Sequence, residues 1–149
     1  VYDIVLEAQY AAIEKTRKGN HWNEPHDAAV EIITRGLRDI GLLEGSLGKL
    51  IKDGAYGEFF MHRTGHWLGM DVHDVGDYKV GEQWRLLEPG MVTTVEPGIY
   101  IPATSRVPKK YQNIGVRIED DVLVTANGAD VLSKGLVKEA DDIEALMAE

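Results

Sequence analysis

The chain has 149 residues, of which 44% are hydrophobic and 28% charged, a composition typical of a folded soluble domain rather than a disordered segment. Its 25 acidic and 16 basic residues give a net charge of −9, which disfavours phosphate backbones and anionic lipid surfaces, so neither nucleic-acid nor membrane partners are expected. Cysteine is absent, which excludes disulfides and thiolate metal sites and fits a cytoplasmic location.

The first third of the chain is predicted to be helical. In residues 1–16, hydrophobic side chains recur at steps of three and four, the pattern of an amphipathic helix. A second helix is predicted for residues 25–41, which begin with proline and end with glycine, and a short third one for residues 46–54. His21 and His26 stand near the start of the second helix, without a carboxylate-rich segment beside them, and are predicted to be exposed to solvent.

The periodicity then changes. Residues 58–132 contain short runs of β-branched and aromatic residues separated by glycine and proline, which predicts mostly antiparallel strands joined by loops. Residues 102–113 form a polar, basic stretch that is predicted to be a loop. Residues 139–149 show helical spacing behind an acidic first turn, which predicts a short final helix. The chain as a whole therefore predicts an α+β fold.

Potential metal ligands are densest in residues 59–74, FFMHRTGHWLGMDVHD, which hold His62, His66 and His73. A helix would put the first two of these histidines on one face, but two nearby glycines disfavour a helix. On an extended strand they would lie ~13 Å apart, too far to bind one ion. We therefore expect one metal ligand and one histidine outside the ligand set, with hydrogen-bonded core histidines as the alternative.

Glu96 ends the alternating run MVTTVEPG. The residue before a proline is held extended, and Pro97 then interrupts strand pairing, so the carboxylate is fixed at a strand end. A glutamate among hydrophobic residues costs several kcal/mol to ionise unless it meets a cation, which a metal would supply. An exposed glutamate on an edge strand explains this segment equally well.

Glu119 stands in a similar run, GVRIEDDVLV. Arg117 and Glu119 share one face of the predicted strand with α-carbons ~6.6 Å apart, so the guanidinium could orient the carboxylate. A solvated charged face is the alternative. One imidazole and two carboxylates delivered by three strand-like segments are what a hydrolytic metal site requires.

The segments FFMHRTGHWLGMDVHDVGDY, LEPGMVTTVEPGIYI and GVRIEDDVLVT resemble successive motifs of the aminopeptidase P family, the Xaa-Pro aminopeptidases of the pita-bread metallopeptidases. The resemblance covers nearly the whole chain. It implies half of a pita-bread fold, in which a curved, mostly antiparallel sheet is backed by helices. It also implies that residues 1–149 form the C-terminal part of a metallopeptidase catalytic domain.

Carried over residue by residue, the resemblance implies that His66, Glu96 and Glu119 are ligands of a site for two divalent metal ions, normally manganese, with zinc or cobalt as alternatives. Glu119 would bridge the ions, and Glu96 would also handle the proton of the attacking water. The family takes two further metal-binding aspartates from a segment that precedes the first helix, and no residue of this sequence precedes Val1.

The resemblance also implies roles around the metals. His62 and His73 would shape the proline side of the pocket and polarise the scissile carbonyl, and Arg117 would support Glu119. The implied partners are peptides with proline at the second position and the upstream half of the same protein, and a homo-oligomer is compatible with the family. A proline dipeptidase of the same fold, a catalytically silent peptide-binding module and a self-contained single-metal hydrolase are the alternative functions.

Overall fold

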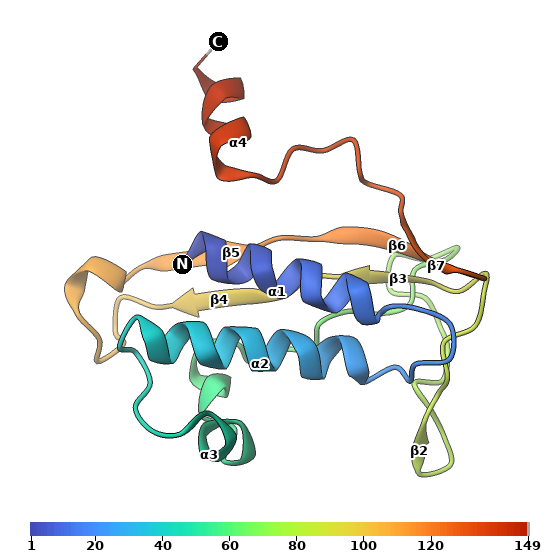
Figure 1. Ribbon diagram of the computed structural model, residues 1–149, viewed down its shortest axis with the longest axis horizontal. Helices are drawn as coiled ribbons and strands as arrows, with labels where there is room; N and C mark the ends of the chain where they lie inside the picture. The colour runs from blue at the N-terminus through green and yellow to red at the C-terminus, as the bar shows by residue number, and fades with distance from the viewer. Residues whose placement is uncertain (149) are drawn as a thin grey trace.

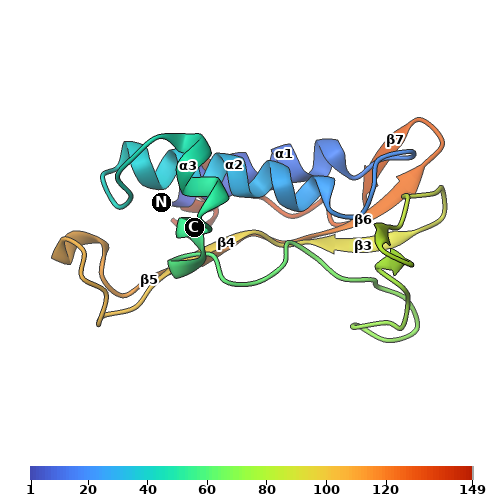
Figure 2. The same ribbon diagram turned by 90° about the horizontal axis from the view of Figure 1, so that it is seen from below.

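The computed structural model describes residues 1–148, in which a layer of helices lies against antiparallel strands (Figure 1, Figure 2). The helices are α1 (Tyr2–Lys15), α2 (Glu24–Asp39), α3 (Leu47–Lys52) and α4 (Ala140–Met147), and the 3₁₀ turns are η1 (Ala55–Glu58) and η2 (Lys109–Tyr111). The strands are β1 (Lys79–Val80), β2 (Gln83–Trp84), β3 (Val92–Val95), β4 (Gly98–Ile101), β5 (Ile114–Arg117), β6 (Asp120–Thr125) and β7 (Gly128–Val131).

Helices α1 and α2 pack side by side on one face of the strands (Figure 2). Their hydrophobic stripes point inward, so that Val5 on α1 and Ile33 on α2 are fully buried. The helices expected from the periodicity are confirmed, including the final one, although residue 149 of that prediction lies outside the described residues. Within residues 1–148, no helix has the length and hydrophobicity needed to cross a membrane.

Strands β3 to β7 form one long antiparallel ribbon with an interruption near its middle, whereas β1 pairs with β2 in a separate two-stranded sheet. On one side of the interruption β3 pairs with β6, which also pairs with β7, and on the other side β4 pairs with β5. The last pair before the break is Val95 with Asp120, and the first pair after it is Gly98 with Arg117. Because Pro97 has no N–H to donate, the regular ladder stops there, and its carbonyl accepts only a long bond of 3.4 Å from the Ile118 N–H. The predicted antiparallel strands are confirmed.

The hydrophobic core fills the space between the helical layer and the ribbon. Phe59, Ile99 and Val122 contribute to it and are at most 1% exposed. Full burial of side chains of this size stabilises a fold by about 1.5–3 kcal/mol each. The core therefore fixes the interrupted part of the ribbon against the helical layer.

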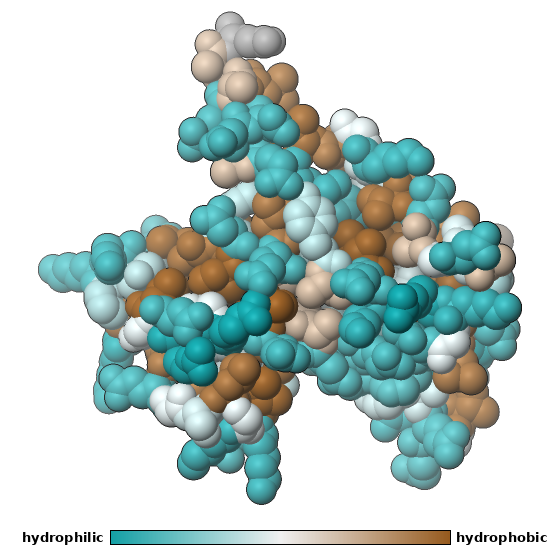
Figure 3. Space-filling model, in the orientation of Figure 1, coloured by the Kyte–Doolittle hydropathy of each residue, from teal (hydrophilic) through white to brown (hydrophobic). Residues whose placement is uncertain are grey.

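The segment after β7 returns across α1 before it forms α4. The Tyr2 hydroxyl donates to the Lys138 carbonyl at 2.6 Å, and the Tyr10 hydroxyl donates to the Glu139 carboxylate at 2.6 Å. Helix α4 itself projects away from the body (Figure 1), and it carries both hydrophilic and hydrophobic surface (Figure 3), including the exposed Leu146. The hydrogen bonds to α1 therefore anchor the residues just before α4 and not the helix itself.

His26 is buried, and the expectation that it is solvent-exposed is wrong. Its Nδ1 lies 2.9 Å from the Thr64 hydroxyl, and its ring packs near Phe60. The spacing explains the burial, because His26 precedes Ala29 and Val30 by three and four residues and so belongs to the inward stripe of α2. His21, by contrast, is partly exposed.

The stability of the fold should depend on pH through His26. Burial, followed by the charges of Arg63 and His62, lowers the pKa of His26 to about 4 from an ordinary value of 6.5. Below pH 6.5, His26 therefore binds a proton in the unfolded chain but not in the folded chain. The free energy of unfolding falls as the pH is lowered, until the pH reaches about 4. The loss should approach about 3 kcal/mol.

Urea unfolding of the full-length protein between pH 7.5 and 4 measures this loss, with His26→Gln as the comparison. Glutamine can keep a hydrogen bond to Thr64 but does not titrate, so the variant should lose clearly less stability over the same interval. Identical pH profiles for the two proteins would refute this account of His26.

Candidate metal centre

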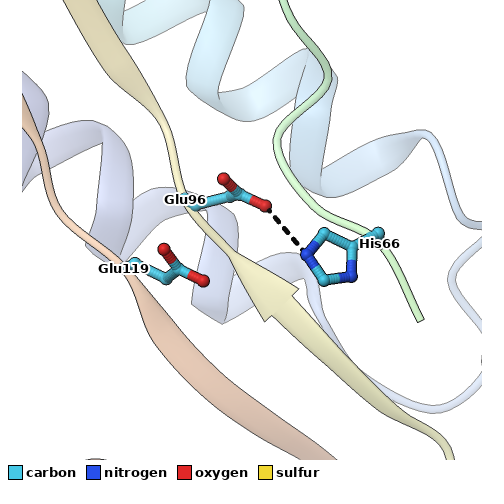
Figure 4. A group of neighbouring side chains, drawn as sticks. All are labelled: His66, Glu96 and Glu119. Atoms are coloured by element: carbon cyan, nitrogen blue, oxygen red, sulfur yellow. Dashed lines mark ion pairs between the residues drawn. The ribbon is translucent and has the colours of Figure 1, made fainter. Parts of the chain in front are cut away.

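Three side chains predicted from the sequence converge at the interruption of the ribbon (Figure 4). His66, Glu96 and Glu119 each offer one potential ligand atom, and these atoms all lie within 4.8 Å of one another. His66 Nε2 is 3.4 Å from Glu96 Oε1, and both of these side chains are mostly buried. The prediction that the three groups share one environment is confirmed.

Residues 64–68 bring His66 to this place by running antiparallel beside β3. The His66 carbonyl accepts from the Thr94 N–H at 3.0 Å, and the Thr64 carbonyl accepts from the Glu96 N–H at 2.7 Å. Gly65 permits the close approach, because a Cβ at that position would lie 2.0 Å from the Thr94 carbonyl oxygen. The segment is extended, as predicted, and not helical.

The hydrogen bonds of His66 fix which of its nitrogens faces the carboxylates. Nδ1 lies 2.9 Å from the Trp67 carbonyl oxygen, which can only accept, so Nδ1 carries the proton. In the neutral ring, the Nε2 lone pair then points at Glu96 Oε1. Two electron-rich atoms facing each other at this distance suit a bound cation.

Glu96 is oriented by its own strand. The Thr94 hydroxyl donates to Glu96 Oε1 at 3.1 Å and accepts from the His66 N–H at 3.0 Å. One hydroxyl therefore links the imidazole segment to the first carboxylate.

Glu119 lies between β5 and β6, on the strand of the interruption that faces Glu96. Glu119 is exposed, but desolvation of its carboxylate by neighbouring atoms, followed by the negative charge of Glu96, raises the pKa of Glu119, while Arg117 opposes the rise. Two neighbouring carboxylates and an imidazole lone pair form a donor set of one nitrogen and hard oxygens, which suits divalent ions such as manganese. The residues present therefore fit a metal site.

The two other predicted histidines are placed differently. The His73 ring packs edge-on against His66, with centroids 4.2 Å apart, and so borders the cluster from the exposed side. His62 does not join the cluster. Its Nδ1 lies 2.8 Å from the Arg63 carbonyl oxygen, and its Nε2 lies 2.9 Å from the Tyr100 hydroxyl.

Arg117 pairs with a different carboxylate from the one the resemblance implies. Its Nη1 lies 3.6 Å from Glu96 Oε2, and its Nε donates to the Tyr100 hydroxyl at 2.7 Å. The break in the ladder explains the contact, because it sets Glu96 close to the end of β5, where Arg117 lies. The Arg117 charge still lowers the pKa of Glu119, so it acts on both carboxylates.

Tyr100 was missed by the sequence reasoning. It joins Arg117 to His62 through one hydroxyl, which accepts from the guanidinium and donates to His62 Nε2. The signal was the two-residue period of β4, which places Tyr100 on the same face as Glu96, four residues earlier.

The sequence model that describes metallopeptidase family M24 matches residues 1–126. The chain belongs to this family. Among its M24 relatives is the Xaa-Pro aminopeptidase of Haemophilus influenzae, 50% identical over 147 residues, which are 99% of this chain and 34% of that protein. The solved structure of Pseudomonas aeruginosa aminopeptidase PepP superposes with a TM-score of 0.98 at 59% identity, covering 99% of this chain and 34% of that one.

A third M24 comparison is the structure of Escherichia coli aminopeptidase P with the inhibitor Pro-Leu, with a TM-score of 0.95, 46% identity and coverage of 99% of this chain and 34% of that one. The chain therefore spans about a third of the length of these relatives and corresponds to their C-terminal part. The predicted α+β pita-bread fold and the resemblance to aminopeptidase P are confirmed.

Proposed function

We propose that the protein containing this chain is a metal-dependent Xaa-Pro aminopeptidase, which hydrolyses the bond between an N-terminal residue and a following proline. The convergence of His66, Glu96 and Glu119 carries the proposal, because it assembles a hydrolytic donor set from three distant segments. Membership of a metallopeptidase family and the Xaa-Pro aminopeptidase relatives support it. Residues 1–149 would form the C-terminal part of the catalytic domain, in a cytoplasmic enzyme.

The proposed cofactor is a pair of divalent metal ions, manganese in the first place and zinc or cobalt as alternatives. His66 would contribute Nε2, Glu119 would bridge, and Glu96 would complete this chain's share of the ligands. Bound there, the metals would activate a water molecule and stabilise negative charge on the scissile carbonyl oxygen. Three side chains cannot saturate two ions, so we propose that two aspartates of the upstream half supply further ligands.

Further roles would concern the substrate and the proton of the attacking water. Glu96, which is held by the Thr94 hydroxyl and paired with Arg117, would take the proton of the attacking water. His73 borders the site at His66 and would polarise the scissile carbonyl. His62, whose Nε2 accepts from Tyr100, would present its ring to the proline side.

The test is hydrolysis by the full-length protein after removal of its metal with a chelator. Xaa-Pro dipeptides, tripeptides and longer peptides are compared with the same peptides carrying alanine in place of proline, with and without added Mn²⁺, Zn²⁺ or Co²⁺. We expect metal-restored cleavage of proline peptides of several lengths. Cleavage of dipeptides alone would favour a proline dipeptidase, and absence of metal-dependent cleavage would favour a silent peptide-binding module.

Removing the Tyr100 hydroxyl should impair catalysis more than folding. The Tyr100→Phe variant leaves Arg117 Nε and His62 Nε2 without their shared partner. We expect kcat/KM to fall about 10- to 100-fold, the usual cost of losing a group that orients others at a metal site. The free energy of unfolding should change by only about 1 kcal/mol.

Steady-state kinetics and urea unfolding check this prediction. Tyr111→Phe is the matched control, because Tyr111 lies in the turn η2 and packs against Lys110, away from the cluster. Equal kcat/KM values for the two variants would show that the Tyr100 hydroxyl has no part in the reaction.

A further inference from the structure

A buried polar network lies behind the two carboxylates, on the helical side of the ribbon. Gln9 of α1 is 0% exposed, and Asp120, the first residue of β6, is 1% exposed. Asp120 follows Glu119 directly, but the alternation of the strand turns the two side chains to opposite faces. The network therefore does not reach the proposed metals itself.

The contacts of Gln9 join two strands. Its Nε2 donates to the Val95 carbonyl at 2.9 Å and to Asp120 Oδ2 at 2.8 Å. Val95 and Asp120 are the last pair before the ladder stops, and the next residues along the two strands toward the break are Glu96 and Glu119. A single side-chain amide thus links the strands at the place where regular backbone pairing ends.

Asp120 is held from its other oxygen as well. Its Oδ1 accepts from Lys138 Nζ at 2.8 Å and from the Ser133 hydroxyl at 2.5 Å. The Lys138 side chain is only 16% exposed, so this ion pair is shielded from solvent. The segment after β7 therefore fixes the carboxylate on which Gln9 acts.

The network does not stabilise the core as well as a hydrophobic side chain at position 9 would. Gln9 lies in the hydrophobic stripe of α1, and its Oε1 is buried without a hydrogen-bond partner among residues 1–148. A buried polar atom left unpaired destabilises a fold, whereas a leucine would fill the same stripe without that penalty. The stability of the core therefore does not explain why a glutamine stands at this position.

We propose that Gln9, Asp120 and Lys138 are positioning residues, which set the separation of Glu96 and Glu119 through the backbone on which these carboxylates stand. The inference rests on the proposed metal site. Metal–ligand distances tolerate deviations of only about 0.2 Å, so a small relaxation of either strand weakens binding. Groups that orient ligands typically change metal affinity 10- to 100-fold when removed.

The experiment measures Mn²⁺ affinity in the full-length protein by calorimetry and by the electron paramagnetic resonance of free Mn²⁺. We expect Gln9→Leu and Lys138→Met to bind Mn²⁺ about tenfold more weakly than the unaltered protein. Lys138→Arg, which keeps the charge beside Asp120, should bind nearly as tightly as the unaltered protein. The absorption spectrum of bound Co²⁺ should change in Gln9→Leu, since the ligand geometry changes.

Ile33→Ala is the matched control. Ile33 is fully buried in α2 and makes none of the hydrogen bonds of the network, so this change destabilises the same core but leaves those bonds in place. It should bind Mn²⁺ as tightly as the unaltered protein. Unaltered Mn²⁺ affinity in Gln9→Leu, or equal weakening in Ile33→Ala, would overturn this inference but not the proposed function. No metal binding by the unaltered protein would instead contradict the proposed function.

Discussion

Replacing Glu119 by alanine is expected to abolish detectable metal binding by the full-length protein. The change removes one of the three potential ligand atoms that lie within 4.8 Å of one another. Because Glu119 is the proposed bridge, both ions lose a ligand and a negative charge together. We expect Mn²⁺ affinity to fall by at least about 100-fold, more than the loss of a merely orienting group, and Xaa-Pro hydrolysis to fall with it. Calorimetric titration and peptide hydrolysis measure the two losses.

Asp121→Ala is the control for Glu119→Ala. It removes one negative charge two residues along the same segment, from a side chain outside the cluster. Its Mn²⁺ affinity should stay within about threefold of the unaltered value, because Asp121 contributes no ligand atom to the cluster and its side chain is only partly buried, so that salt still screens its charge. Tight Mn²⁺ binding by Glu119→Ala would refute the proposed ligand role, and a catalytically silent module would then explain the cluster.

Gly65→Ala is expected to damage both the fold and the site. The added Cβ would lie 2.0 Å from the Thr94 carbonyl oxygen, a backbone atom, so residues 64–68 must move away from β3. Overpacking costs about 1–3 kcal/mol and each lost backbone hydrogen bond about 1 kcal/mol, so the free energy of unfolding should drop by roughly 3 kcal/mol. His66 moves with the segment, and Mn²⁺ affinity should fall at least about tenfold.

Urea unfolding and Mn²⁺ titration of the full-length protein test this prediction, the titration being done where the variant is still folded. Gly48→Ala is the control, because Gly48 lies in α3 with open space around its Cβ position. Alanine there should be neutral or stabilising by up to about 1 kcal/mol. If Gly65→Ala keeps both stability and Mn²⁺ affinity, the approach of this segment to β3 does not set the position of His66.

Local sequence patterns were enough for the elements and drew attention to Glu96 and Glu119, but the choice of His66 rested on the resemblance to the aminopeptidase P family. The three- and four-residue spacing predicted α1 and α2, because a helix that covers a core must keep its hydrophobic side chains on one stripe. The Glu-Pro-Gly sequence at Glu96 predicted a strand end, since proline cannot donate to a ladder. Each glutamate stood out because it lies in a hydrophobic run, whereas the spacing of the histidines left open which of them is the ligand.

Tertiary structure alone decided which partners these side chains meet. Arg117 contacts Glu96, and Gln9 reaches Asp120 from 111 residues away, because the register of the ribbon and the packing of α1 bring them together. His26 was misjudged because the lack of a carboxylate-rich segment beside it was read as a sign of exposure, although its spacing already placed it on the inward stripe of α2. Only its contact with Thr64 depended on the tertiary structure. Motifs encode which chemical groups are present, but hydrogen-bond partners depend on strand register and packing, which arise only when distant segments meet.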